Sequence, residues 1–151
     1  MTQHPMHPIR ARKGGLSQSI TLSCTDPWGR TVAVPTTLGF RVDDPYAVAL
    51  MFHSASADVE WVVARDLLLD GLGAPCGEGD VKAYPSIGDD AHAVTILDFC
   101  SPDGRLIAQA DSMVLQRFLA GTFELVPAGS ESSCLDIDGV IAALLGADRD
   151  Q

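Results

Sequence analysis

Residues 94–110, VTILDFCSPDGRLIAQA, decide the fold class because they contain two strand-like segments joined by a strong turn. In the turn, SPDG at residues 101–104, proline presets one dihedral angle, aspartate hydrogen-bonds to its own backbone, and glycine accepts a positive φ. The flanking segments 94–100 and 105–110 are rich in aliphatic residues. The stretch therefore predicts an antiparallel β-hairpin.

Strand-like patterns also precede this hairpin. From residue 16 to residue 24, apolar side chains alternate with serine and threonine, which is typical of a strand with one face in water. The residues DPWG at 26–29 supply turn chemistry, and 31–34 return as a second strand, so a further hairpin is expected. The segments 47–53, 59–64 and 81–84 are also interpreted as strands.

Two helices are predicted before residue 122. Residues 65–72 suit a short helix that Gly71 closes in the left-handed conformation. After residue 110 the apolar period becomes 3.6, with Asp111 as the N-cap and Gly121 as the end of the helix.

A last helix is predicted over residues 136–146. The small residues Gly139, Ala142 and Ala143 lie opposite its large apolar face. A helix without a clearly polar side is normally covered on both sides. We therefore expect this helix to form a contact between copies of the chain, or to dock on its own sheet.

These elements predict one α+β domain. Its main part is an antiparallel β-sheet of about six or seven strands, with a short helix and two C-terminal helices. A chain of 151 residues suits a single core. We expect a flexible N-terminal arm at residues 1–15, the domain at 16–147 and a tail at 148–151.

The charge of the chain disfavours nucleic acid as a partner. The sequence has 20 acidic and 10 basic residues, a net charge of -10. Three of the cations, Arg10, Arg12 and Lys13, precede the first acid, so from residue 26 onward the balance is 7 - 20 = -13. A protein with this excess of acidic residues repels a polyanion such as DNA or RNA. The chain also has neither an apolar run long enough to span a membrane nor a signal peptide, so we expect a cytoplasmic protein.

No catalytic or metal-binding motif is found in the sequence. His53 and His92 are interpreted as ordinary histidines at strand ends. The spacing of the sequence does not group either of them with a carboxylate and a nucleophile. The four cysteines are scattered without a Cys-x-x-Cys pair, and Cys24 and Cys100 are expected to be small buried hydrophobes. We expect no enzymatic activity, no metal and no cofactor.

The two tryptophans differ in their setting. Trp61 lies among valines and is expected in the core. Trp28 lies in the turn between Pro27 and Gly29, so its ring either folds back over the sheet or anchors a partner.

The middle of the chain resembles the SsgA-like sporulation and cell-division proteins, with their SsgB branch as the nearest match. The matching motifs are DPYAV at 44–48, FH at 52–53, VEWV at 59–62, ARDLL at 64–68, GDV at 79–81 and PS at 85–86. Order and spacing also agree downstream, so the resemblance covers roughly residues 16–146, apart from the stretch 87–93, which does not match.

This resemblance implies a non-enzymatic adaptor that marks septum sites and recruits or stabilises the tubulin-like division GTPase FtsZ, working with an SsgA-like paralogue. It also implies a subunit similar to the Whirly fold, assembled as a homo-oligomer, with a trimer favoured. Because Whirly-type proteins bind single strands, a single-stranded nucleic-acid-binding module is the alternative function. The candidate protein-contact residues are Trp28, Asp44, Pro45, Tyr46, Arg65, Asp66, Gly139, Ala142 and Ala143. Pro45 also suits a rigid turn and Asp66 a helix start.

Overall fold

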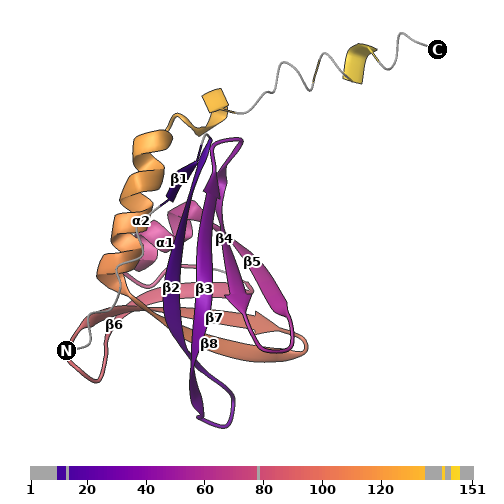
Figure 1. Cartoon of the computed structure of the whole chain (residues 1–151). Helices are drawn as coiled ribbons and strands as arrows, with labels where there is room; N and C mark the ends of the chain where they lie inside the picture. The colour runs from indigo at the N-terminus through magenta and orange to yellow at the C-terminus, as the bar shows by residue number, and fades with distance from the viewer. Residues whose placement is uncertain (1–9, 13, 78, 135–140, 142–143, 147–151) are drawn as a thin grey trace.

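A computed structural model describes residues 10–12, 14–77, 79–134, 141 and 144–146 of the chain (Figure 1). The elements follow in the order β1 (Arg10–Arg12), β2 (Gly15–Thr25), β3 (Thr31–Arg41), β4 (Asp44–His53), β5 (Asp58–Ala64), α1 (Arg65–Gly71), β6 (Val81–Ile87), β7 (Ala93–Ser101), β8 (Gly104–Asp111), α2 (Ser112–Leu125) and a 3₁₀ helix, η1 (Glu131–Cys134). This confirms the predicted fold class, a mainly antiparallel sheet with a few helices.

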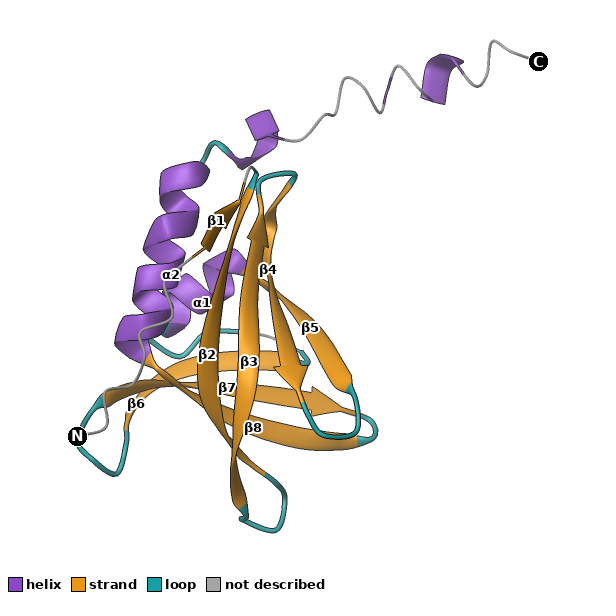
Figure 2. Cartoon of the chain, viewed as in Figure 1, coloured by secondary structure: helices purple, strands orange, loops and turns teal. Residues whose placement is uncertain are grey.

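The strands form one curled antiparallel sheet in the order β5-β4-β3-β2-β8-β7-β6, and β1 adds to the edge of β2. Strand β2 pairs with β3 along its whole length but with β8 only at Ser23–Thr25, so it joins two groups of strands. These groups, β2–β5 and β6–β8, cross one another, and α1 and α2 lie together at one side (Figure 2). The predicted hairpin at residues 94–110 is confirmed by β7 and β8.

The core lies where the two groups of strands and the helices meet. Phe99 of β7 packs edge-on against Phe52 at a centroid distance of 5.7 Å, and its ring is tilted against that of Trp61 at 4.9 Å. Trp61 is half-buried because β5 is the last strand of the sheet, and it packs against the core as predicted. Cys24 is buried as predicted, and burial raises the pKa of its thiol. Cys100, expected to be buried, is exposed, because it lies at the end of β7 beside the turn.

The two glycines predicted to end helices have another role. Gly71 does not take a positive φ, and a Cβ on it would lie 2.4 Å from the Cβ of Ala83. Gly121 lies inside α2, where a Cβ would lie 2.9 Å from Cδ1 of Leu16. Helix α1 ends at Gly71 as predicted, but Gly71 is not in the left-handed conformation. The predicted end at Gly121 is wrong, because α2 continues to Leu125. Both glycines allow the helices to approach the strands closely. The N-cap prediction is confirmed, since Oδ1 of Asp111 accepts from the main-chain N–H groups of Met113 and Val114 at 2.9 and 3.2 Å.

The two ends of the chain differ from the expected arm and last helix. Residues 10–12, within the expected N-terminal arm, pair with β2 as β1. Most of residues 136–146, and all of the predicted tail, lie outside the described residues. Residues 141 and 144–146 are helical, and the side chains of Ile141, Leu144 and Leu145 are exposed.

Candidate protein-contact surface

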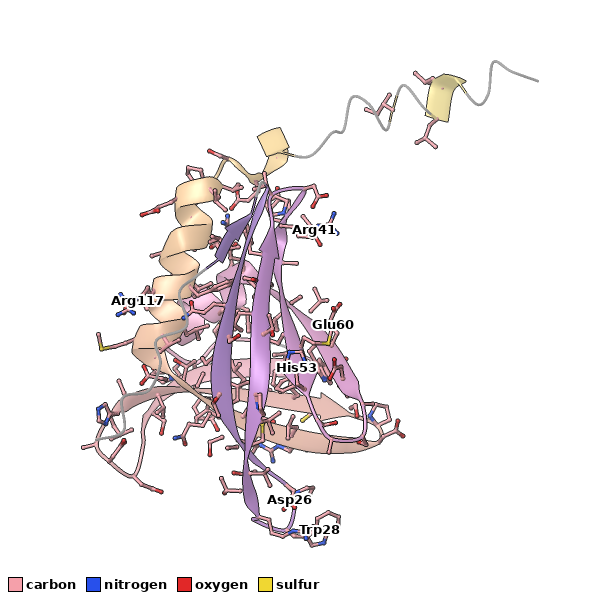
Figure 3. The ribbon with its side chains drawn as sticks, in the orientation of Figure 1. Asp26, Trp28, Arg41, His53, Glu60 and Arg117 are labelled. Carbon is pink, nitrogen blue, oxygen red and sulfur yellow. The ribbon has the colours of Figure 1, made fainter. Side chains whose placement is uncertain are left out.

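Trp28 lies at the tip of the β2–β3 hairpin, where hydrogen bonds to one carboxylate hold the turn together (Figure 3). Oδ1 of Asp26 accepts from the main-chain N–H groups of Trp28 and Arg30, each at 2.9 Å, and its Oδ2 accepts from Nε of Arg30 at 2.9 Å. Hydrogen bonds, first of all from the main-chain N–H of Arg30, lower the pKa of Asp26. Gly29 supports the turn with a φ of 83°. The tip therefore has a fixed shape.

The Trp28 ring points into solvent. It is 79% exposed, and Cζ of Arg30 lies 5.7 Å from its ring centroid. The interpretation that the ring folds back over the sheet is therefore wrong, because the hairpin extends beyond the strands on which the ring would rest (Figure 3). Exposed tryptophans on rigid supports are frequent anchors of protein contacts.

The structure brings two other groups of candidate residues together at the opposite end of the β2–β5 strands. Asp44 and Tyr46 are exposed at the start of β4, whereas Pro45 between them is buried and is not available to a partner. Because the β4–β5 pairing ends at Ala47 opposite Ala64, this segment adjoins the start of α1. Asp66 is exposed there, in the first turn of α1.

Arg65, predicted as a surface contact, is buried in the domain with 1% of its surface exposed. Its guanidinium donates to the main-chain oxygens of Thr122 and Val126 at 3.2 and 2.8 Å and to Oε1 of Glu131 at 3.0 Å. It also stacks on Phe123, with Cζ 3.9 Å from the ring centroid. The prediction for Arg65 is therefore wrong: it joins α1 to the carboxyl end of α2 and to η1.

Glu131, the partner of Arg65, was missed by sequence reasoning. Hydrogen bonds from its own main-chain N–H, from Arg65 and from the N–H of Gly129 lower the pKa of this carboxyl. The sequence carries no local signal of the pair, because its two members are 66 residues apart.

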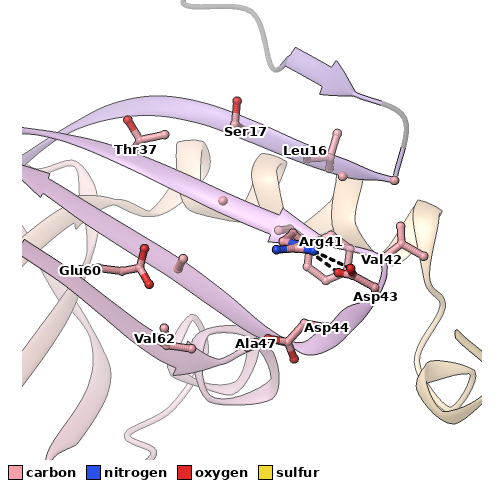
Figure 4. Close-up of a pocket in the computed structure, with 15 residues that line it drawn as sticks. Leu16, Ser17, Thr37, Arg41, Val42, Asp43, Asp44, Ala47, Glu60 and Val62 are labelled. Atoms are coloured by element: carbon pink, nitrogen blue, oxygen red, sulfur yellow. Dashed lines mark hydrogen bonds and ion pairs between the residues drawn. The ribbon is translucent and has the colours of Figure 1, made fainter. Parts of the chain in front are cut away.

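A groove of about 960 Å³ lies on the outer face of β2–β5 (Figure 4). Its surface is formed largely by small residues, among them Gly15, Ser17, Gly39, Ala47 and Ala49. Its charged residues are Arg41, Asp43, Asp44 and Glu60. Arg41 donates from Nε and Nη2 to Asp43 at 2.9 and 2.5 Å, which leaves two carboxylates in excess. The groove is therefore acidic, and only the strand register, which sequence reasoning did not supply, reveals it.

The structure also unites His53 with a carboxylate and a hydroxyl, contrary to the prediction. Nε2 of His53 lies 2.7 Å from Oγ1 of Thr37, and its Nδ1 lies 3.3 Å from Oδ1 of Asp58. These are the residue types of a catalytic triad. Thr37, however, is paired on both sides, with Ser19 and Met51, so the sheet uses the main-chain N–H groups that an oxyanion would need. The arrangement fixes the histidine on the face of the sheet.

Some candidate sites fall outside what the structure describes. Gly139, Ala142 and Ala143 are not among the described residues. In the described part of the chain, no group of three His, Cys, Asp or Glu side chains is arranged to hold a metal ion. Within that same part, none of the helices is long and apolar enough to cross a membrane.

The chain is similar to known cell-division proteins of sporulating bacteria. The family described as "Streptomyces sporulation and cell division protein, SsgA" matches residues 34–131. The sporulation-specific cell division protein SsgB of Kineococcus radiotolerans is 41% identical over 142 residues, which cover 93% of this chain and 85% of that protein. SsgB of Thermobifida fusca is 43% identical over 112 residues, or 74% and 80% of the two chains.

Solved structures agree with the sequence comparisons. The crystal structure of an SsgA-like sporulation-specific cell division protein from Thermobifida fusca superposes with a TM-score of 0.77 at 37% identity, covering 89% of this chain and 98% of that chain. A structure described in connection with SsgB mutations and longitudinal cell division in Streptomyces coelicolor gives a TM-score of 0.76 at 34% identity, covering 83% and 100%. The chain belongs to the SsgA family of sporulation and cell division proteins.

Proposed function

We propose that this protein is a non-enzymatic adaptor of cell division during sporulation, which marks septum sites and recruits or stabilises FtsZ. The observation that carries the proposal is the 41% identity over 93% of the chain to a protein named as a sporulation-specific cell division protein. The roles in septum marking and FtsZ recruitment come from the family resemblance and are the part that needs testing.

The surface suits contact with proteins. The Trp28 tip presents a large ring on a turn fixed by Asp26, which lowers the entropy lost when a partner binds. At the other end of the sheet, Tyr46 is 49% exposed beside Asp44 and Asp66. Both features are surface projections of the kind that a partner protein encloses.

We also propose a homo-oligomer, with a trimer favoured, and an SsgA-like paralogue as a further partner. The exposed apolar side chains of Ile141, Leu144 and Leu145 support an assembly that covers the C-terminal helix. Gly139, Ala142 and Ala143, which lie outside the described residues, stay candidate contact residues on the basis of the sequence. Light scattering on a sizing column gives the mass of the assembly, and a monomeric mass would contradict it.

Co-sedimentation with FtsZ tests the adaptor function. Purified protein should increase the mass of FtsZ polymer in the pellet and should sediment together with it. It should not hydrolyse GTP by itself. Trp28→Ala and Tyr46→Ala should reduce this effect, whereas Val32→Ala, which removes another exposed apolar side chain of the same hairpin, should leave it unchanged. Unchanged polymer mass at all protein concentrations would contradict the proposal.

Filter binding to single-stranded DNA tests the alternative of a nucleic-acid-binding module. Contacts to phosphate give an affinity that falls steeply with salt. The charge of -13 from residue 26 onward supports the adaptor, which should retain no DNA even at low salt. Tight retention with a steep salt dependence would favour the alternative.

A further inference from the structure

Strand β5 ends the sheet with an exposed edge. Among the described residues it pairs only with β4, and all of its residues except Trp61 and Val63 are exposed. Val59 and Val62 are 50% and 56% exposed. A free strand edge offers a row of main-chain N–H and C=O groups to which another chain can pair.

The opposite edge of the sheet, β6, is protected against such pairing. Cys76 forms a bridge to Ala83, with a 2.8 Å hydrogen bond in each direction. Pro85 lacks a donor, and Lys82 adds an exposed charge. Prolines, lysines and covering segments are the usual means of blocking an edge. Strand β5 has no proline or lysine, and no described strand other than β4 pairs with it, so the two edges differ.

The β5 edge continues into the acidic groove. Glu60 and Val62 belong to β5 and line the groove (Figure 4). Val62 pairs with Ala49, Ala49 with Gly39, and Gly39 with Ser17, so one row of small side chains extends across four strands behind the edge. These side chains leave room on the outer face for larger side chains of an added strand.

Charge decides which kind of strand fits. The groove has two carboxylates in excess, and Asp58 adds an acid at the edge itself. A second copy of the chain would bring its own Asp58 and Glu60 to the same edge, which disfavours pairing between two β5 strands. A segment with lysine or arginine is attracted by the same acids.

We propose that the free edge of β5 and the adjoining acidic groove bind an extended, cationic segment of a partner protein by strand addition. Apolar side chains of the added strand continue the inner face beyond Val59 and Trp61, and its cations on the outer face meet Glu60. This inference goes beyond the adaptor function and does not depend on FtsZ being the partner.

Amide hydrogen exchange by NMR tests the proposal with a capped octapeptide of alternating valine and lysine as the probe. The main-chain amides of residues 58–64 that point away from β4 should gain protection when the peptide binds, and those of β6 should not. The same peptide with lysine replaced by glutamate, or with alternate amides N-methylated to remove one row of donors, should bind about tenfold more weakly or less. Protection gained only elsewhere, or equal binding of the N-methylated peptide, would overturn the proposal.

Two charge reversals supply matched variants. Glu60→Lys should weaken binding by about tenfold at low salt, whereas Glu124→Lys, at an exposed position on α2, should change it less than about twofold. Glu60→Gln gives the same direction of change if Glu60→Lys does not fold. Equal dissociation constants for the variants at the two positions would contradict the proposal. A different outcome is that the β5 amides are protected without peptide and that this protection rises with protein concentration. It would show that a second copy of the chain occupies the edge, and it would overturn the proposal.

Discussion

Replacing Arg65 with methionine tests whether the buried guanidinium holds the C-terminal part of the domain in place. Arg65 is 1% exposed, and it donates to two main-chain carbonyls and one carboxylate. Methionine fills part of the same volume but has no donor, so all three acceptors lose their partner. Breaking a buried ion pair by removing one member costs about 3–5 kcal/mol. That is a large fraction of the roughly 5–15 kcal/mol by which most domains are stable.

Urea unfolding followed by circular dichroism measures this loss. With an m-value of about 1–3 kcal/mol per molar urea, the midpoint of Arg65→Met should fall by more than about 1 M. Arg41→Met is the matched control, because Arg41 also pairs with a carboxylate but its side chain is 76% exposed. An exposed pair contributes little, so this control should unfold close to the wild type. Equal midpoints for the two variants would refute the role assigned to Arg65.

Three further outcomes are expected. Gly71→Ala should destabilise the domain by about 1–3 kcal/mol through overpacking, whereas Gly73→Ala, with nothing within 4 Å of the added Cβ, should not. Because the folded-state pKa of Glu131 lies below its ordinary value of 4.5, its contribution to stability should be present above that pH and lost as pH falls through the lower folded pKa. Between pH 6 and pH 3 the urea midpoint of the wild type should therefore fall more steeply than that of Glu131→Gln. An equal dependence of the two midpoints on pH would contradict this role of Glu131. A thiol reagent should label exposed Cys100 in the native protein before buried Cys24, as peptide mass spectrometry can show, and the reverse order would be inconsistent with the structure.

Local patterns in the sequence were sufficient for the hairpins and for the N-cap of α2. The SPDG turn and the aliphatic segments on either side of it specify β7 and β8 without reference to the rest of the chain. Strand β3 is longer than its local pattern, which appeared to stop before Pro35. The strand continues because Pro35 pairs with Thr21 of β2 and lies just beyond the first β4 partner, Thr36, where its missing donor is not needed.

The contact surface depended more strongly on tertiary structure. Arg65 was predicted as a contact residue because it lies in the ARDLL motif of the family resemblance, although arginine is seldom fully buried. Its burial follows from carbonyl groups at the end of α2, which lie 57 and 61 residues further along the chain. The groove likewise depends on register, since Gly39, Ala49 and Val62 become neighbours only when three strands pair. The turn chemistry around Trp28 was visible locally, but the exposure of its ring required the three-dimensional structure.

Two-colour imaging of sporulating Streptomyces coelicolor cells that lack their own SsgB tests the adaptor function most directly. The full chain, labelled with one fluorophore, is expressed together with FtsZ labelled with another. The adaptor function predicts that the chain gathers at future septum sites first, that FtsZ then assembles at the same positions, and that Trp28→Ala weakens this second step. FtsZ ladders that form before the chain arrives, or that form equally well without it, would contradict the adaptor function.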